Sequence, residues 1–313
     1  MKRAFVTGGS GFLGKRLIEE LVRRGVGVVA LARSDAAAAT VKAVGAEPAK
    51  GDLDAVAGVD GCDVVFHAAA YVKQSGPMAE FMKANVEGTK NVLAAARAAG
   101  AKRFVHIGTE AVLADGKPIV RANEQVPYPA KPAGPYPLTK GLAEQAVVAA
   151  NGEGGLETVV VRPRLIWGKG DTSVLAEMIA VVKAKKFGWI GGGHYLTSTC
   201  NVANVVDGAI LAAEKGRGGA IYFLTDGEPV EWREFVTKML ATQGVDAGTR
   251  EVPRWLAKTV VVLTSWMKQP PVTRTALALM GHEVTVDDSK ARAELGYAPR
   301  VSIEAGLAEM RPA

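Results

Sequence analysis

The sequence predicts an α/β protein with a doubly wound parallel sheet and a second, smaller lobe. Short apolar runs alternate with helix-length segments over the first two-thirds of the chain, and these runs are apolar at nearly every position. Such strands are typical of a parallel sheet with helices on both faces. A length of 313 residues, of which 48% are hydrophobic and 22% charged, is sufficient for one large domain with a smaller partner.

Each expected element follows from a local pattern. The apolar runs that we expect to form strands are 4–7, 26–31, 64–67, 104–107 and 159–161. The amphipathic or helix-length segments are 13–22, 79–99 and 136–150. Residues 202–214 and 220–224 are expected to return to the sheet domain, and 231–244 to belong to the cap. Gly25 ends the first helix, and the proline-rich stretch 115–137 indicates an ordered loop.

The composition argues against several kinds of protein. The formal charge is +6 and the sequence pI about 9.2, but Lys and Arg are scattered along the chain, which indicates a solvated surface or an anionic small ligand rather than nucleic acid. Cys62 and Cys200 lack the spacing of a zinc site or a disulfide framework, so we expect no metal site and reduced thiols in the cytoplasm. We expect no signal peptide, and no apolar stretch reaches the ~20 residues that span a bilayer.

A glycine-rich turn joins the first strand to the first helix. Residues 7–14 read Thr-Gly-Gly-Ser-Gly-Phe-Leu-Gly. Glycine permits a tight turn and a close approach of the backbone to a pyrophosphate, and the N-terminus of the following helix attracts anions. The spacing therefore predicts a Rossmann-type dinucleotide-binding domain. The residues of this turn that we expect to contact the cofactor are Gly8, Ser10, Gly11, Phe12, Leu13 and Gly14.

The alternation of strands and helices becomes irregular after Gly168. We predict that residues 1–168 and 201–226 form the Rossmann domain. Residues 169–200 and 227–313 are expected to form a substrate-binding cap. The two lobes would be built from discontinuous segments, with a cleft between them.

The end of the second strand indicates which dinucleotide binds. An acidic residue here would bind the ribose 2′-hydroxyl of NAD, whereas an arginine suits the 2′-phosphate of NADP. The chain has Ala32 followed by Arg33 and Ser34. We expect NADP as the preferred cofactor with NAD as a second choice; the alternative is that Arg33 is a solvated charge. Asp52 and Leu53 are expected beside the adenine, although Asp52 could equally cap a helix.

A tyrosine and a lysine four residues apart stand at the start of a predicted helix. Tyr136 and Lys140 share one helix face, and Pro137 lies in the first turn, where its missing N–H is not needed. A nearby ammonium, an oxidised nicotinamide and a helix N-terminus all favour the phenolate form of a tyrosine. Tyr136 is therefore a candidate general acid or base.

Together these motifs resemble the extended short-chain dehydrogenase/reductase family over nearly the whole chain. Beyond the glycine turn and the tyrosine–lysine pair, the matching positions are His67, Ala68, Ala69, Ala70, Asn85, Glu124, Pro127, Pro132, Arg162, Pro163, Trp167 and Gly168. The further cofactor contacts that the resemblance implies are Ala68, Ala69, Ala70, Asn85, Tyr136, Lys140 and Pro163.

The resemblance also implies roles in hydride transfer. Tyr136 would act as the acid or base, and Lys140 would lower its pKa and hold the nicotinamide ribose. A hydroxyl after the fifth strand would orient the substrate oxygen. Thr109 is our candidate, where relatives more often have serine, and Gly108 replaces a second common serine. The alternative is that Thr109 only ends the strand.

Residues 196–206 bear on the substrate. Sugar-nucleotide members of the family usually hold a diphosphate with an arginine in this region, and the region contains none. It is similar instead to the 3β-hydroxysteroid dehydrogenase branch, as are residues 162–171 and 270–297. This resemblance implies a secondary alcohol or ketone on a bulky apolar skeleton, of the steroid, sterol or 2-alkyl-3-oxo acid type. A sugar-nucleotide epimerase or dehydratase is the alternative enzyme, and a non-catalytic dinucleotide sensor is the alternative of another class.

Two further expectations concern surfaces and histidines. The apolar segment 255–267 is too short to span a bilayer, but it could rest on a membrane or wall a lipid pocket; a buried cap helix or a dimer contact is the alternative. Relatives often dimerise through the helices around Asn85 and Tyr136, so the resemblance implies a homodimer. His67 and His106 are expected to be buried and hydrogen-bonded rather than ligands.

Overall fold

The computed structural model describes residues 1–73, 75–267 and 270–311. Its centre is a seven-stranded sheet of order β12-β7-β5-β4-β1-β2-β3, in which every neighbouring pair is parallel. Its strands are β1 (Arg3–Thr7), β2 (Gly27–Ala32), β3 (Glu47–Lys50), β4 (Val64–His67), β5 (Arg103–Ile107), β7 (Glu157–Pro163) and β12 (Ile221–Leu224). The predicted fold class is confirmed.

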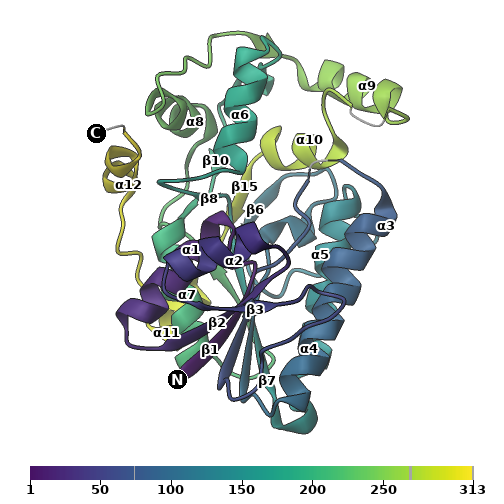
Figure 1. The fold of residues 1–313 in the computed structure, drawn as a ribbon. Helices are drawn as coiled ribbons and strands as arrows, with labels where there is room; N and C mark the ends of the chain where they lie inside the picture. The colour runs from purple at the N-terminus through teal and green to yellow at the C-terminus, as the bar shows by residue number, and fades with distance from the viewer. Residues whose placement is uncertain (74, 268–269, 312–313) are drawn as a thin grey trace.

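Helices cover both faces of this sheet (Figure 1). One face packs against α1 (Phe12–Arg23), α2 (Asp35–Ala43) and α7 (Val202–Lys215), and the other against α4 (Gly88–Ala98) and α5 (Pro135–Ala149). Within β1, Ala4 and Val6 belong to the first core cluster and Phe5 to the second. Since successive side chains point to opposite faces, a strand covered on both sides must be apolar throughout.

The predicted helix 79–99 is not uniform. It divides into α3 (Met78–Phe81), a π-helical turn η1 (Met82–Glu87) and α4. A π-turn widens a helix by one residue and recurs at functional sites. Here it contains the buried Asn85.

A four-stranded sheet lies beside the cap. Its order is β13-β10-β15-β6, with β13 (Val230–Glu231), β10 (Leu196–Thr197), β15 (Val284–Val286) and β6 (Ile119–Ala122). Strand β6 falls inside the predicted loop 115–137, so that part of the prediction is wrong. Its pairing partner β15 lies far away in the sequence, and no local pattern indicates such a partner.

The cap contains α6 (Val174–Lys183), α8 (Trp232–Ala241), α9 (Arg254–Thr264), α10 (Arg274–Met280) and α12 (Ile303–Met310). A core around Trp167, Trp189 and Trp232 joins α6, α8 and α12. The shorter elements are η2 (Glu110–Leu113), η3 (Glu153–Gly155), β8 (Ile166–Trp167), β9 (Trp189–Ile190), η4 (Gly191–Gly193), β11 (Cys200–Asn201) and β14 (Glu251–Val252). Among the described residues, no helix has the length and apolarity needed to cross a membrane.

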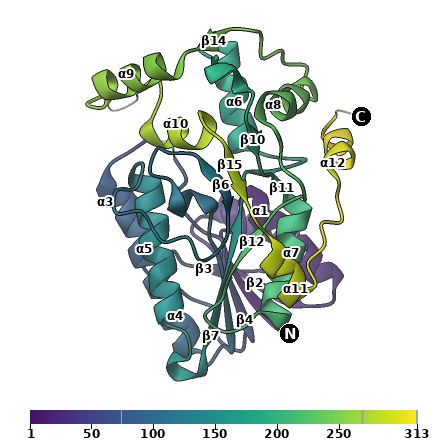
Figure 2. The same cartoon turned by 180° about the vertical axis from the view of Figure 1, so that it is seen from behind.

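Helix α11 (Ser289–Leu295) packs on the central sheet domain. It lies within the sequence range predicted for the cap, yet Ala291, Leu295 and the following Tyr297 belong to the core cluster of α1 and α7. Figure 2 shows α11 beside α7, below the cap. The division into 1–168 with 201–226 and 169–200 with 227–313 stays a prediction.

Candidate active site

The carboxyl ends of the parallel strands form one edge of the sheet, and the predicted site residues follow these ends. Strand β1 lies between β2 and β4, so the chain reverses its winding direction beside β1. Ligands of doubly wound sheets bind at this switch point. The residues that directly follow the ends of β1, β2, β4 and β5 are Gly8, Arg33, Ala68 and Gly108.

The glycine turn requires its glycines. Gly8 has a φ of +72°, and a Cβ placed there would lie 2.8 Å from the backbone of Ala68. A Cβ on Gly14 would lie 2.1 Å from the carbonyl oxygen of Gly8. Helix α1 begins at Phe12 with Gly11 as N-cap and no side-chain cap. The first amides of α1 therefore have no side-chain acceptor at their cap, which suits a pyrophosphate.

Arg33 and Ser34 follow β2 as predicted. Arg33 is exposed, and the Ser34 hydroxyl accepts a hydrogen bond of 3.2 Å from the amide of Ala37 at the start of α2. Ser34 is therefore the N-cap of a helix. This arrangement puts a cation and a helix N-terminus side by side at the end of β2.

Asp52 and Leu53 lie in the loop after β3. The Asp52 carboxylate accepts hydrogen bonds from the amides of Asp54 and Ala55, both at 2.9 Å. It therefore forms a local turn rather than a helix cap. Leu53 packs against Gly88 at the start of α4, where a Cβ would lie 2.8 Å from the leucine side chain.

His67 fixes the backbone that faces the glycine turn. Its Nε2 bonds the Thr89 hydroxyl at 2.9 Å, and its Nδ1 bonds the Thr7 hydroxyl at 2.7 Å. Thr89 donates its own proton to a carbonyl oxygen, so it accepts from His67, and Thr7 donates to the ring. Thr7 also accepts from the amide of Ala69. Burial lowers the pKa of His67 to about 3, so the expectation of a buried, hydrogen-bonded histidine is confirmed.

Asn85 connects the loop after β4 to α5. Its Oδ1 accepts from the Tyr71 amide at 2.7 Å, and its Nδ2 donates to the Tyr71 carbonyl and to the Thr139 hydroxyl. Both amide hydrogens and the oxygen are thus engaged within the protein. The geometry shows Asn85 holding the position of α5 next to Lys140; cofactor contact by Asn85 stays a prediction.

Lys140 is buried one turn after Tyr136. Its Nζ donates to the carbonyl oxygen of Ile107 at 2.8 Å and lies 3.3 Å from Nε2 of His106. Burial lowers the pKa of Lys140 to about 8, against the opposing charge of Glu144. The ammonium thus lies at the end of β5, close to where the chain enters the Thr109 turn.

The pKa of Tyr136 departs from our expectation. Burial, and then the charge of Glu110, raises this pKa, while a hydrogen bond with Thr109 acts in the opposite direction. Lys140 is not among the causes of this shift, and the expected lowering by Lys140 and the nicotinamide stays a prediction. A phenol held in its protonated form can act as a general acid.

Thr109 lies between Tyr136 and a buried ion pair. Its Oγ1 donates to Oε2 of Glu110 at 2.8 Å and accepts from the amide of Ala111, which makes Thr109 the N-cap of η2. The other oxygen of Glu110 pairs with Arg164 at 3.0 Å, and both side chains are buried. Arg164 also donates to the carbonyl oxygen of Leu279 in α10. The cap and the predicted catalytic hydroxyl are thus connected through two side chains.

A second buried ion pair fixes α5 against the sheet. The guanidinium of Arg162 donates to the carboxylate of Glu144, whose Oε1 also accepts from the Tyr128 hydroxyl at 2.5 Å. The Arg162 guanidinium lies 5.3 Å from the ring centroid of Phe223. These contacts hold α5 against the sheet one turn beyond Lys140, and Arg162 directly precedes Pro163, the last residue of β7.

Sequence reasoning missed two side chains at this edge, Glu110 and Arg164. Glu110 follows the predicted strand 104–107, and Arg164 follows the motif of Arg162 and Pro163. A charged residue beside such apolar segments is a signal in the sequence for a functional site. His106 was expected to be satisfied, but its Nδ1 has no partner among the described residues. Burial and Lys140 hold the pKa of His106 well below its usual value. No group of three or more His, Cys, Asp or Glu side chains in the described part of the chain is arranged to hold a metal.

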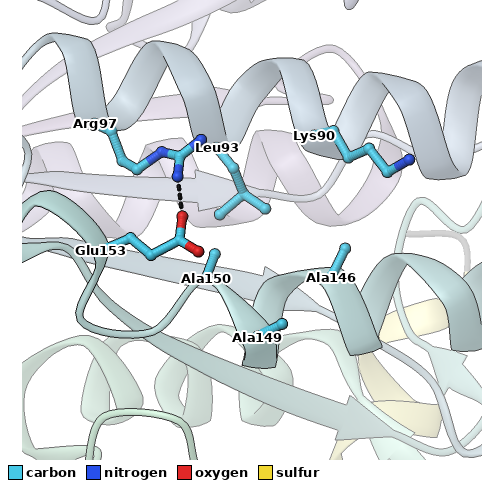
Figure 3. Close-up of a pocket in the computed structure, with 7 residues that line it drawn as sticks. All are labelled: Lys90, Leu93, Arg97, Ala146, Ala149, Ala150 and Glu153. Carbon is cyan, nitrogen blue, oxygen red and sulfur yellow. Dashed lines mark hydrogen bonds and ion pairs between the residues drawn. The ribbon is translucent and has the colours of Figure 1, made fainter.

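A shallow hollow lies between α4 and α5, away from this edge. Figure 3 shows Arg97 paired with Glu153 at one end, and Leu93 above the small side chains of α5. The hollow is lined by Lys90, Leu93, Arg97, Ala146, Ala149, Ala150 and Glu153. Its position marks the outer surface of the two helices rather than the site.

A dinucleotide turn and a proton-exchanging tyrosine at the same sheet edge are typical of nicotinamide-dependent oxidoreductases. The comparisons make the class specific. The chain belongs to the 3-beta hydroxysteroid dehydrogenase/isomerase family, which it matches over residues 5–254. The protein is an enzyme, an NAD(P)-dependent oxidoreductase that interconverts secondary alcohols and ketones.

Its relatives span the full length of the chain. It is 51% identical over 322 residues to the 4-hydroxy-2-methyl-3-oxo-4-farnesyl-3,4-dihydroquinoline-1-oxide ketoreductase of Stigmatella aurantiaca, with 99% of this chain and 96% of the relative covered. It is 32% identical over 329 residues to the decarboxylating sterol-4-alpha-carboxylate 3-dehydrogenase of Dictyostelium discoideum, with 99% and 100% covered. The crystal structure of gox2253 matches at a TM-score of 0.81 and 28% identity, with 99% and 97% covered.

Proposed function

We propose that this enzyme is an NADP-preferring ketoreductase or dehydrogenase for a bulky apolar substrate, of the steroid, sterol or 2-alkyl-3-oxo acid type. The observation that carries the proposal is the placement of Thr109 at the end of β5 next to α5, which carries Tyr136 and the buried Lys140. An acid, an orienting hydroxyl and a cation are the groups that ketone reduction requires of the protein.

The proposed roles follow from this geometry. Tyr136 gives its proton to the ketone oxygen during reduction, and takes it back during oxidation. Thr109 turns its hydroxyl from Glu110 toward the same oxygen. Lys140 holds the ribose of the nicotinamide, which supplies the hydride and, when oxidised, a positive charge that favours the phenolate.

The remaining cofactor contacts would come from the sheet edge. The turn from Gly8 to Gly14 would hold the pyrophosphate on the N-terminus of α1. Arg33 and Ser34, beside the N-terminus of α2, suit the 2′-phosphate of NADP. The further contacts proposed are Asp52, Leu53, Ala68, Ala69, Ala70, Asn85 and Pro163.

Residues 196–206 support an apolar substrate. The segment carries no charged side chain, and its buried polar groups bond within the protein. Thr199 and Asn204 both donate to the carboxylate of Asp226, so they form a structural network rather than a diphosphate clamp. The names of the two relatives describe a farnesylated quinoline oxide and a sterol, both large and mainly apolar.

The test is oxidation of NADPH and NADH by the purified enzyme with a set of ketones. The set contains a 3-ketosteroid, a 2-alkyl-3-oxo acid, a farnesylated dihydroquinoline ketone and a UDP-4-keto sugar. We expect reduction of at least one apolar ketone, faster with NADPH. Reduction of the sugar alone would instead support an epimerase or dehydratase, the alternative enzyme.

A non-catalytic dinucleotide sensor is the alternative of another class. It would bind NADPH without turning over any ketone, and Lys140→Ala would alter a partner complex. The proposal further includes a cytoplasmic homodimer. The hollow between α4 and α5, where Leu93 lies above the small side chains of Ala149 and Ala150 (Figure 3), suits helix packing across a dimer.

A further inference from the structure

Helix α9 is apolar on two opposite sides. Ala257 and Val261 are buried and pack with Leu277 of α10. On the other side, Trp255 is 68% exposed and Val262 71% exposed. A helix on the surface of a globular protein normally presents polar side chains to solvent. The exposed side of α9 is therefore apolar although it faces solvent.

The exposed side is a continuous stripe. Residues 255 and 262, and likewise 256 and 263, are seven positions apart on α9, a spacing that places side chains on one face of a helix, and Trp266 and Met267 follow shortly after the helix ends at Thr264. Leu263 is 66% and Trp266 82% exposed. Figures 1 and 2 show α9 projecting at the outer end of the cap, far from the sheet. The stripe is thus at an extremity of the molecule and accessible to a flat partner.

The charge around the stripe is of one sign. Residues 252–282 contain four Lys or Arg and no Asp or Glu. Lys258 is exposed on α9 itself, whereas Arg254 donates to the carbonyl oxygen of Gly281 and lies over the ring of Tyr195. A segment with basic and no acidic residues beside an apolar stripe complements a surface that is both apolar and negative.

We propose that residues 254–267 bind the surface of a bilayer containing anionic phospholipids. Tryptophans at both ends of an apolar stripe match the preference of indole for the membrane interface. The 11 residues of α9 are too few to span a bilayer, so the helix would lie in the interface plane. Only the reason for membrane binding rests on the proposed function: a bulky apolar ketone dissolves in the bilayer, and the cap would take it up there.

The test is co-sedimentation of the full chain with vesicles. One set contains phosphatidylcholine alone, and the other phosphatidylcholine with phosphatidylglycerol. We expect binding to the mixed vesicles, reduced by salt, with a blue shift of tryptophan emission and quenching by brominated lipid. Leu263→Ser/Trp266→Ser should weaken this binding by at least about tenfold.

Two variants separate charge from apolar contact. Lys258→Glu should weaken binding to the mixed vesicles by about tenfold and leave binding to phosphatidylcholine unchanged. Val120→Ser removes an apolar side chain that is 60% exposed on β6, and should change neither. Circular dichroism of each variant checks that the fold is retained.

Two results would overturn the inference. Wild-type protein that sediments with neither vesicle excludes a membrane partner. A self-association that Leu263→Ser/Trp266→Ser abolishes, with no binding to vesicles, would assign the stripe to a second copy of the chain. Vesicle binding needs no substrate, so it can succeed when every ketone fails. Conversely, the proposed function predicts unchanged turnover of a water-soluble ketone in the α9 variants.

Discussion

The hydroxyl of Thr109 points its proton at the carboxylate of Glu110, with 2.8 Å between Oγ1 and Oε2. The same oxygen accepts from the Ala111 amide, and the carboxylate is held by Arg164. Thr109 can therefore donate to a substrate oxygen only by exchanging its bond to Glu110. Glu110 acts on the site twice, because its charge also raises the pKa of Tyr136.

Glu110→Gln should move the pH dependence of reduction. The amide keeps an acceptor for Thr109 but removes the charge that raises the pKa of Tyr136. Reduction requires protonated Tyr136, so the alkaline limb of kcat/KM should shift to lower pH by about one unit. A pH profile with NADPH and a ketone measures the shift.

The control is Glu157→Gln, which removes an exposed carboxylate paired with Arg103. This control should leave the alkaline limb of the kcat/KM profile at the same pH. Because Glu110→Gln strands the buried Arg164, its free energy of unfolding should fall by about 3–5 kcal/mol. A folded variant with an unshifted limb would show that Glu110 does not influence Tyr136.

Tyr136→Phe should abolish most turnover while NADPH still binds. Loss of a positioned acid lowers kcat by about 100- to 10,000-fold. Steady-state rates and NADPH fluorescence titration measure the two effects. Tyr128→Phe is the matched control, since that hydroxyl bonds Glu144 behind the site; it should reduce stability rather than kcat. Equal losses of kcat in both variants would argue against the assigned role.

Arg33→Ala should change the cofactor preference. Removal of a charged contact to the 2′-phosphate weakens NADPH binding by about 10- to 100-fold and leaves NADH binding unchanged. Dissociation constants for both cofactors test this. Arg97→Ala, in the hollow between α4 and α5, should change neither. An equal loss of affinity for NADPH and NADH would mean that Arg33 does not contact the 2′-phosphate.

Lys140→Met should stabilise the protein near neutral pH. Burial lowers the pKa of Lys140 from 10.5 to about 8. Between these values the unfolded chain binds more protons, so the free energy of unfolding of the wild type rises with pH across this window. Below it the penalty of about 3 kcal/mol applies in full. Loss of the hydrogen bond to Ile107 offsets about 1 kcal/mol of the stabilisation that Lys140→Met gains by removing the buried ammonium.

Urea denaturation at about pH 7 and about pH 9.5 tests this prediction. The variant should gain about 1–2 kcal/mol at the lower pH and less at the higher one. Lys131→Met replaces an exposed lysine on the preceding loop and should show no pH-dependent difference. A gain that grows with pH would contradict the assigned burial effect.

Local patterns predicted the sheet domain well. Strand β4 begins and ends at the predicted residues, and α5 is displaced by one residue at each end. Both depend on apolar periodicity, which sequence displays directly. The pairing of β6 with β15 and the packing of α11 on α7 depend on residues far apart in the chain. The π-turn around Asn85 has no known local signature in this sequence.

The sequence predicted which residues form the candidate site, but not the protonation state of Tyr136. Tyr136, Thr109 and Lys140 follow motifs, and the structure brings them to one edge. The state of Tyr136 was not predictable, because its pKa depends on which charges are buried nearby. Glu110 is adjacent to Thr109 in sequence, but only the fold supplies Arg164 and makes a buried carboxylate tolerable.

The return of α11 to the sheet domain has a consequence for folding cooperativity. A chain that ended after β12 would lose Leu295 and Tyr297 from the central core and β15 from its pairing with β6. Neither predicted lobe therefore contains all the residues of its own core. Both cores are complete only when the C-terminal segment has packed against them. We expect the enzyme to unfold as one unit, and proteolysis between the lobes to release no autonomous nucleotide-binding module.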